Sequence, residues 1–333
     1  VLDPPTVNLD FSYYLTDGFA ERSLGFFVQT TGAGMNRGGI GTANVEGNFA
    51  SGHLVSNSGV NFYIITSPDG VDLNQTGVTL DANDSTMGIG NCYISDYSVE
   101  LAVGSLPTVN VTVEGANMNS TMSAASGVIV SPAVNQANGN QFTTGGVQLP
   151  PPSRDGGITG ALGGAAITAL RPDDVSVNLA NLDGQSLVDI DGSDGAHIQS
   201  VSISLPLSRT PLDRLGSRFA FAREIDFPVV ATLNVSAIVS NARAANLADL
   251  LNSDVKEASI MIKNGIPTGA GGTQNDAIQY KMKGLKIDSQ SFSSSIGSNK
   301  TVDITFSTQI GGLNDTENGI FMSGINGIVP VFD

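Results

Sequence analysis

The chain has 333 residues, which is long enough for about two domains, and it carries a formal net charge of −16. Because an acidic surface repels phosphate groups, this charge disfavours sequence reading of nucleic acids and adhesion to anionic membranes. No apolar stretch approaches the roughly 20 residues that cross a bilayer, so we expect no membrane span. Cys92 is the only cysteine, so the fold must depend on packing and hydrogen bonds rather than on an intrachain disulfide.

Apolar and polar residues alternate with a period of two along much of the chain, which predicts β-strands. In chain order, the expected strands cover residues 7–13, 60–65, 94–103, 109–113, 175–179, 201–205, 229–239, 258–262, 278–287 and 302–306. Clusters of Gly, Pro, Asn and Asp separate them. With 40 glycines, no Trp and 6% aromatic residues, the composition also favours short strands and tight turns. We therefore expect a mainly β protein.

Three segments depart from this alternation. Residues 242–251 have Ala, Leu and Asp at helical spacing, and their apolar stripe of Leu247, Leu250 and Leu251 is suited to docking on a sheet. The ranges 31–42 and 135–165 are rich in Gly, Asn, Thr and Pro, and we expect them to be long loops. Loops of this size in a compact protein usually serve binding or assembly.

An internal repeat is the most informative feature of the sequence. The segments Ile94–Leu101 and Ile198–Leu205 share a pattern, and each is followed by an apolar-Pro strand start at Leu106 and Phe227. The segments Leu170–Ile190 and Leu285–Ile304 also correspond, ending in Val-Asp-Ile. This order predicts two tandem, related β-sandwich or β-barrel domains, 1–195 and 196–333, with the helix in the second. The alternative is that alternating strands resemble one another without duplication.

The charge is divided unevenly between the two predicted domains. Residues 1–195 hold four Arg and nineteen acidic residues, a net of −15, whereas residues 196–333 hold eleven basic and twelve acidic residues, a net of −1. Four arginines gather in the inserted segment 208–226, and their forked donors suit carboxylates. We expect them to contact the acidic half of a neighbouring copy; in the alternative, they pair locally in a solvated loop. They are Arg209, Arg214, Arg218 and Arg223.

Catalytic and ligand-binding patterns are missing from the sequence. His53 and His197 have no nucleophile motif beside them, and Cys92 has no evident His partner. The run Asp189–Gly195 fails the EF-hand pattern and is expected to be a turn, although its sequence leaves open whether Asp189–Asp194 bind a metal. The Gly-rich run Gly32–Gly39 fits neither phosphate-binding pattern. We therefore expect no enzyme, no cofactor and no metal.

Three parts of the sequence carry a resemblance to a known family. Ser291–Gly312 resembles the closing hairpin of structural proteins from tailed bacteriophages, and Arg209–Gly216 with Arg223–Pro228 looks similar to them too. Tyr97–Pro107, followed by a strand, has the character of tail tube subunits. The resemblance covers both predicted repeats, but it consists of strand and turn patterns.

This resemblance implies β-sandwich or β-barrel domains that self-assemble into stacked rings around a channel for DNA, in the tail of a virion made in the host cytoplasm. Two tube domains in one chain would let a trimer imitate a hexameric ring. The partners would be other copies and other virion proteins, and DNA would pass without specific binding because the channel is acidic. In this scheme, 31–42 and 135–165 make contacts between rings and 208–226 makes contacts within a ring. The alternatives are another virion component (baseplate, tail terminator or capsid decoration protein) and a secreted carbohydrate-binding or adhesin module.

Overall fold

The computed structural model describes residues 7–16, 18–30, 47–55, 59–66, 69, 85–121, 128–135, 140–141, 146–148, 175–181, 196–217, 219–239, 256–263, 276–293, 300–312, 315 and 317–324. The two helices in these residues are α1 (Phe19–Ser23) and α2 (Ser51–Val55). The strands are β1 (Val7–Tyr14), β2 (Gln29–Thr30), β3 (Val60–Thr66), β4 (Ser85–Ala102), β5 (Thr108–Gly115), β6 (Asn117–Thr121), β7 (Val128–Val130), β8 (Val134–Asn135), β9 (Asn140–Gln141), β10 (Gly146–Gln148), β11 (Val175–Asn181), β12 (Ala196–Pro206), β13 (Arg209–Leu212), β14 (Ala222–Ile225), β15 (Val230–Val239), β16 (Lys256–Lys263), β17 (Asp276–Ser293), β18 (Thr301–Gln309) and β19 (Gly319–Gly324).

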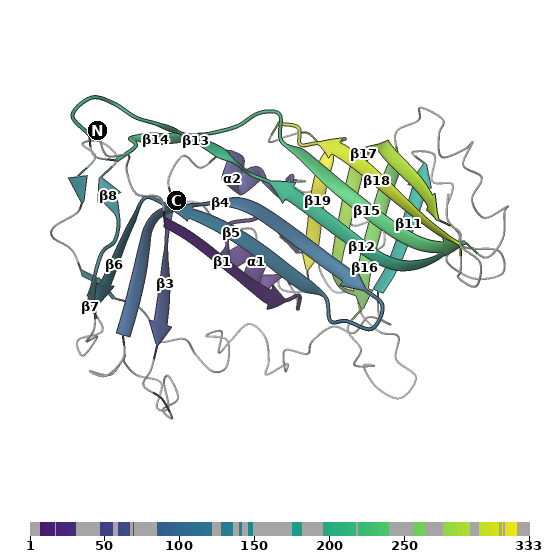
Figure 1. Ribbon diagram of the computed structural model, residues 1–333, viewed down its shortest axis with the longest axis horizontal. Coiled ribbons are helices and arrows are strands. Elements are labelled where there is room, and N and C mark those ends of the chain that lie inside the picture. The colour runs from purple at the N-terminus through teal and green to yellow at the C-terminus, as the bar shows by residue number, and fades with distance from the viewer. Residues whose placement is uncertain are drawn as a thin grey trace.

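Thirteen of these strands form one curled sheet (Figure 1). Its central section, which we call sheet A, has the order β1-β5-β4-β12-β15-β18-β17 and is antiparallel throughout. β4 and β17 are each 18 residues long, and their first halves extend beyond sheet A. The first half of β17 joins β11, β16, β19 and β2 in sheet B, and the first half of β4 joins β3 and β6 in sheet C. The mainly β fold expected from the sequence is confirmed.

One five-strand unit occurs twice in the chain. In the first repeat, β4 pairs with β3 and β6 through its first half and with β5 through its second half, and β5 pairs with β1. In the second repeat, β17, β16, β19, β18 and β15 take the corresponding places. β12 lies between the repeats and pairs with β4 on one side and β15 on the other. The two halves of the chain are therefore joined by a continuous sheet.

Matching irregularities fix the register between the two repeats. β4 has a bulge against β5 directly after Ile94, and β17 has a bulge against β18 directly after Ile287. Three residues before Ile94 and Ile287, Asn91 and Gly284 have positive φ values of 52° and 71°. A left-handed backbone is uncommon for residues other than Gly, and Asn tolerates it better than most. The repeats therefore share the bend of the long strand as well as the strand order.

The segments that are equivalent in the two structural repeats differ from the segments that the sequence predicts to be equivalent. The sequence predicts that Ile94–Leu101 corresponds to Ile198–Leu205, but these segments lie side by side as paired strands, with Leu101 opposite Val201. The counterpart of β4 is β17. Alternating Ser and apolar residues are typical of any strand with one buried and one polar face, so the pattern alone does not separate neighbours from counterparts.

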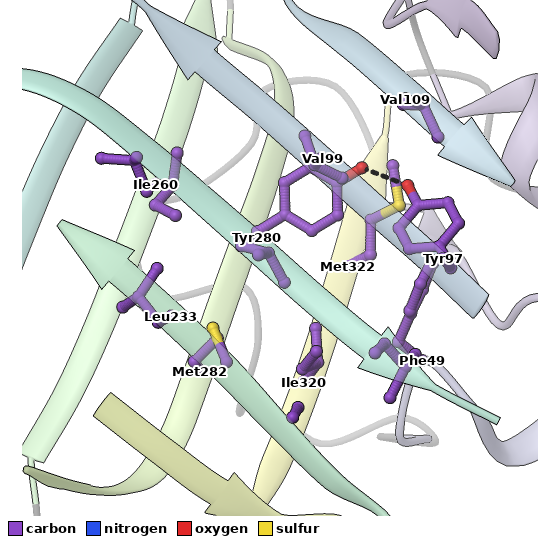
Figure 2. Close-up of a cluster of buried hydrophobic side chains, with 14 of the residues drawn as sticks. Phe49, Tyr97, Val99, Val109, Leu233, Ile260, Tyr280, Met282, Ile320 and Met322 are labelled. Atoms are coloured by element: carbon purple, nitrogen blue, oxygen red, sulfur yellow. Dashed lines mark hydrogen bonds between the residues drawn. The ribbon is translucent and has the colours of Figure 1, made fainter. Parts of the chain in front are cut away.

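The core joins the two repeats. The apolar face of sheet A packs against sheet B and against the described residues between β1 and β3 of the first repeat, which we call the connector (residues 15–16, 18–30, 47–55 and 59). Figure 2 shows Phe49 of the connector and Tyr97 of β4 beside Tyr280, Ile320 and Met322 of the second repeat. The Phe49 and Tyr280 rings meet edge to face with centroids 6.2 Å apart, and the Phe49 backbone N–H donates to the Ile320 carbonyl at 2.7 Å. The connector thus covers the inner face of sheet B.

Some of the expected elements lie outside the described residues. These are the helix at 242–251, the loop at 31–42 and most of the loop at 135–165, in which the described parts include β9 and β10. Asp189–Asp194, the candidate metal-binding turn, also lies outside them.

Candidate functional site

Sheet A presents one apolar and one polar face, and the polar face is continuous across seven strands. One row of paired residues reads Ser12, Asn110, Ser98, Ser204, Thr232, Ser307 and Lys286. The next row reads Tyr14, Thr108, Glu100, Ser202, Asn234, Thr305 and Ser289. The side chains on this face are exposed or partly exposed, whereas their neighbours along the strands are mostly buried. We call this surface the polar face.

Side-chain hydrogen bonds hold part of the polar face in a fixed arrangement. The Asn234 amide donates to Ser202 Oγ at 3.3 Å, and the Thr305 hydroxyl donates to Asn234 Oδ1 at 2.9 Å. On the same strand as Thr305, the Ser307 hydroxyl donates to Asp288 Oδ1 of β17 at 2.8 Å. Short polar side chains with few rotamers thereby cover β12, β15, β18 and β17 without projecting far from the sheet.

The charge on the polar face is predominantly negative. Six carboxylates lie on the described strands of this face, and they are Asp10, Asp96, Glu100, Glu114, Asp288 and Asp303. Glu114 is paired with the Arg223 guanidinium, and the other five stand against the ammonium group of Lys286. Partial burial raises the pKa of Asp96. A surface of hydroxyls, amides and carboxylates offers little to a phosphate backbone and repels it over a Debye length.

Sheet A has open edges at both ends. Among the described strands, β1 pairs only with β5, and the second half of β17 pairs only with β18. In the two repeats, β1 corresponds to β15 and β17 corresponds to β4. The edges of β15 and β4 that correspond to these open edges are both paired with β12. Phe292 on the open β17 edge is 52% exposed, whereas its counterpart Val99 is fully buried. Gln290 Nε2 is buried there without a hydrogen-bond partner.

β13 and β14 form a two-stranded arm after β12 (Figure 1). Arg209 at its base is buried, stacks over the Tyr93 ring at 4.8 Å, and donates to the Arg223 carbonyl at 3.1 Å and to the His53 carbonyl. Arg223 forms an ion pair with Glu114 at 3.0 Å. Two arginines therefore fasten the arm to the first repeat of the same chain.

The four arginines selected from the sequence thus have different surroundings. Arg209 and Arg223 make the contacts within the chain just described, and Arg214 is exposed with its guanidinium 5.7 Å from the Phe221 ring centroid. Arg218 lies outside the described residues. A role for these arginines in contacts between copies stays a prediction, and Arg214 is the described one whose position is open to a neighbour.

The described residues hold few groups suited to catalysis. Burial and the nearby Arg209 lower the pKa of His53 to about 4, and burial raises the pKa of Cys92 to about 12, so neither is poised for proton transfer or nucleophilic attack at neutral pH. The side chain of His197 is outside the described part. In that part, no three His, Cys, Asp or Glu residues gather as metal ligands, and no helix has the length and apolarity to cross a membrane.

No protein family and no curated protein matches the sequence. Solved structures match parts of the fold. A chain from the virion of a native gene transfer agent particle is 13% identical, with a TM-score of 0.25, over 44% of this chain and 97% of its own length. A chain of the anti-feeding prophage baseplate is 12% identical, with a TM-score of 0.29, over 49% of this chain and 98% of its own length. The Hcp1 protein from the E. coli EAEC 042 pathovar is 13% identical, with a TM-score of 0.24, over 46% of this chain and 98% of its own length.

These likenesses are partial, since each spans less than half of this chain, and such TM-scores assign no function by themselves.

Proposed function

We propose that this chain is a structural subunit that assembles with copies of itself into a ring or tube, with the polar face lining a channel. The single observation that carries this proposal is the polar face itself, a seven-strand acidic surface of short side chains on a protein with a well-packed core. A surface of this size and charge favours passage of a polyanion over its binding. We infer that the polyanion is DNA and that the particle is a phage tail.

The open β1 edge of sheet A supports assembly. Unpaired edge strands are natural sites for pairing with another chain, and proteins that stay monomeric usually protect them with Pro, Lys or bulges. β1 pairs with β5 over eight residues without a bulge, contains no Pro or Lys, and ends in the exposed Tyr14. An edge at each end of one sheet suits head-to-tail contacts, which generate closed rings or helical filaments.

The two repeats bear on the symmetry of such a ring. A chain with two related units can place twice as many units around a channel as it has copies, so a trimer would imitate a hexamer. The division into domains 1–195 and 196–333 remains part of this proposal, with β12 as the strand that joins the repeats. We propose no catalytic residue and no cofactor for this role.

Negative-stain electron microscopy of the purified protein over a concentration series tests the proposal. We expect rings or hollow tubes whose channel admits duplex DNA, with symmetry that reports the number of copies. A protein that remains monomeric at every concentration would contradict self-assembly as its role.

A further inference from the structure

The first repeat carries an exposed apolar surface at a place where the second repeat is buried. On sheet C, Ile64 pairs with Met87, and Met118 lies one row away on the same face. These side chains are 37%, 39% and 50% exposed. We call them the sheet C patch. Adjacent exposed apolar side chains on one sheet face mark interaction surfaces more often than isolated ones do.

The register of the repeats identifies the counterpart of each residue in the patch. Counted from the shared bulges, Met87 corresponds to Tyr280, which pairs with Ile260 as Met87 pairs with Ile64. Met118 corresponds to Ile320, because they pair with the equivalent residues Ile89 and Met282. These counterparts, Ile260, Tyr280 and Ile320, are at most 1% exposed.

The chain itself shows what covers that face in the second repeat. The connector of the first repeat crosses onto sheet B, where Phe49 packs on Tyr280 and binds the Ile320 carbonyl (Figure 2). In the same place, the Asn48 amide donates to the Asn318 carbonyl at 3.3 Å, and β2 adds a parallel strand to β19. The connector of the first repeat thus covers this face of sheet B, which belongs to the second repeat.

We propose that a second copy of this chain closes the sheet C patch in the same way, with its second repeat placed against the first repeat of its neighbour. This inference deepens the proposed function by naming the surface and the direction of assembly. The open β1 and β17 edges fit the same placement, since β12 covers their counterparts at the junction inside the chain. The contact is heterologous, so it continues from copy to copy rather than closing as a two-fold dimer.

The test compares assembly of the wild type with that of a variant carrying Met87→Lys and Met118→Lys. Both positions are exposed, so we expect the variant to keep its circular dichroism spectrum and thermal stability while losing rings or tubes in electron microscopy and sedimentation. Val103→Lys is the matched control, because Val103 is 68% exposed in the turn after β4; it should assemble as the wild type does. A double variant that assembles normally would overturn the proposal.

Two further readouts keep the result unambiguous. Hydrogen–deuterium exchange should show β3 and β6 gaining amide protection when the wild type assembles, and unchanged exchange in an assembled particle would count against the proposal. Ser120→Cys on the same face should not form disulfide-linked dimers, whereas efficient dimers would indicate a two-fold contact and contradict the head-to-tail placement. A wild type that never assembles would instead contradict the proposed function itself.

Discussion

Tyr97 of the first repeat and Tyr280 of the second share a hydrogen bond of 2.8 Å between their hydroxyl oxygens, and both side chains are fully buried. Tyr97 also donates to Glu21 Oε1 at 3.4 Å, and Tyr13 donates to the same atom at 3.0 Å. Glu21 is 1% exposed, so these phenols solvate a carboxylate that water does not reach. The network connects β1, α1, β4 and β17, and thereby fixes how the two repeats sit together.

Removing the hydroxyl of Tyr280 should weaken the junction of the repeats. Tyr280→Phe leaves the Tyr97 and Tyr13 donors on Glu21 in place, so we expect the free energy of unfolding to fall by about 1 kcal/mol. Tyr97→Phe should cost more, about 2 kcal/mol, because it removes a donor from a buried carboxylate and a partner from Tyr280. Chemical denaturation measures both, and Tyr14→Phe on the exposed polar face is the control with no expected change.

His53 should make stability depend on pH. Its pKa is lowered to about 4 in the folded protein, chiefly by burial and then by Arg209, against about 6.5 in the unfolded chain. Between these values the unfolded chain binds a proton that the folded protein does not, so the free energy of unfolding falls as the pH decreases from 6.5 to 4. The loss from this residue reaches about 3 kcal/mol at the acid end.

Denaturation of the wild type and of His53→Gln at pH 7 and pH 5 isolates this effect. We expect the wild type to lose more stability between the two pH values than the variant does. Equal losses in both proteins would show that His53 does not contribute.

The arginines of the arm should separate into structural and exposed classes. Arg209→Ala removes a buried guanidinium with two carbonyl partners and a ring contact, so we expect a loss of about 3 kcal/mol in the free energy of unfolding. Arg214→Ala should change stability by less than about 0.5 kcal/mol, because its side chain is exposed. If Arg214→Ala nevertheless reduces sedimentation of assembled protein, the contact between copies predicted from the sequence includes this residue. Similar stability losses in both variants would contradict the distinction.

Charge reversal on the polar face should affect DNA and leave the fold intact. Glu100→Lys combined with Asp303→Lys exchanges two exposed carboxylates on β4 and β18, so stability should change little. Assembled particles of this variant should retain short duplex DNA in low salt and release it as salt increases, whereas wild-type particles should not. Asp213→Lys is the control, because it also makes the chain less negative but lies in the exposed turn of the arm and not on a strand of the polar face. DNA retention equal to that of the control would contradict the channel assignment.

The strands were predictable from the sequence because a sheet with one buried and one polar face imposes alternation on every strand. Val109, Val111 and Val113, for example, alternate with Asn110 and Thr112, and the structure places the first set in the core. The fold class follows directly from this pattern. The regularity of the alternation also explains why the sequence repeat matched β4 with β12: β12 has the same alternation as β4, which lies beside it. The counterpart of β4 is β17, and it is identified by the matching bulges and by the positive φ values of Asn91 and Gly284. Neither feature can be predicted from the alternation of apolar and polar residues.

The arm and its anchors were only partly predictable. The four arginines of residues 208–226 stand out by composition, but the partners of Arg209 and Arg223 do not, because Tyr93, Glu114 and His53 are distant in sequence. Arg209 is buried against the Tyr93 ring of β4, a contact that depends on the fold and not on sequence neighbours. The sheet C patch has no sequence signal of its own, since Ile64, Met87 and Met118 read as ordinary core residues. Only comparison with Ile260, Tyr280 and Ile320 shows that they lack a cover.

The central claim, that the polar face lines a channel, is tested most directly by size-dependent labelling of a cysteine placed in its middle. Asn234→Cys lies on β15 at the centre of sheet A, and Glu317→Cys provides an exposed control away from this face. Cys92 is buried with a raised pKa, so it should remain unlabelled. In assembled particles, we predict that Asn234→Cys reacts with a small maleimide and resists a maleimide carrying a large poly(ethylene glycol) chain, while Glu317→Cys reacts with both. Equal reaction of Asn234→Cys with both reagents in the assembled state would contradict the account.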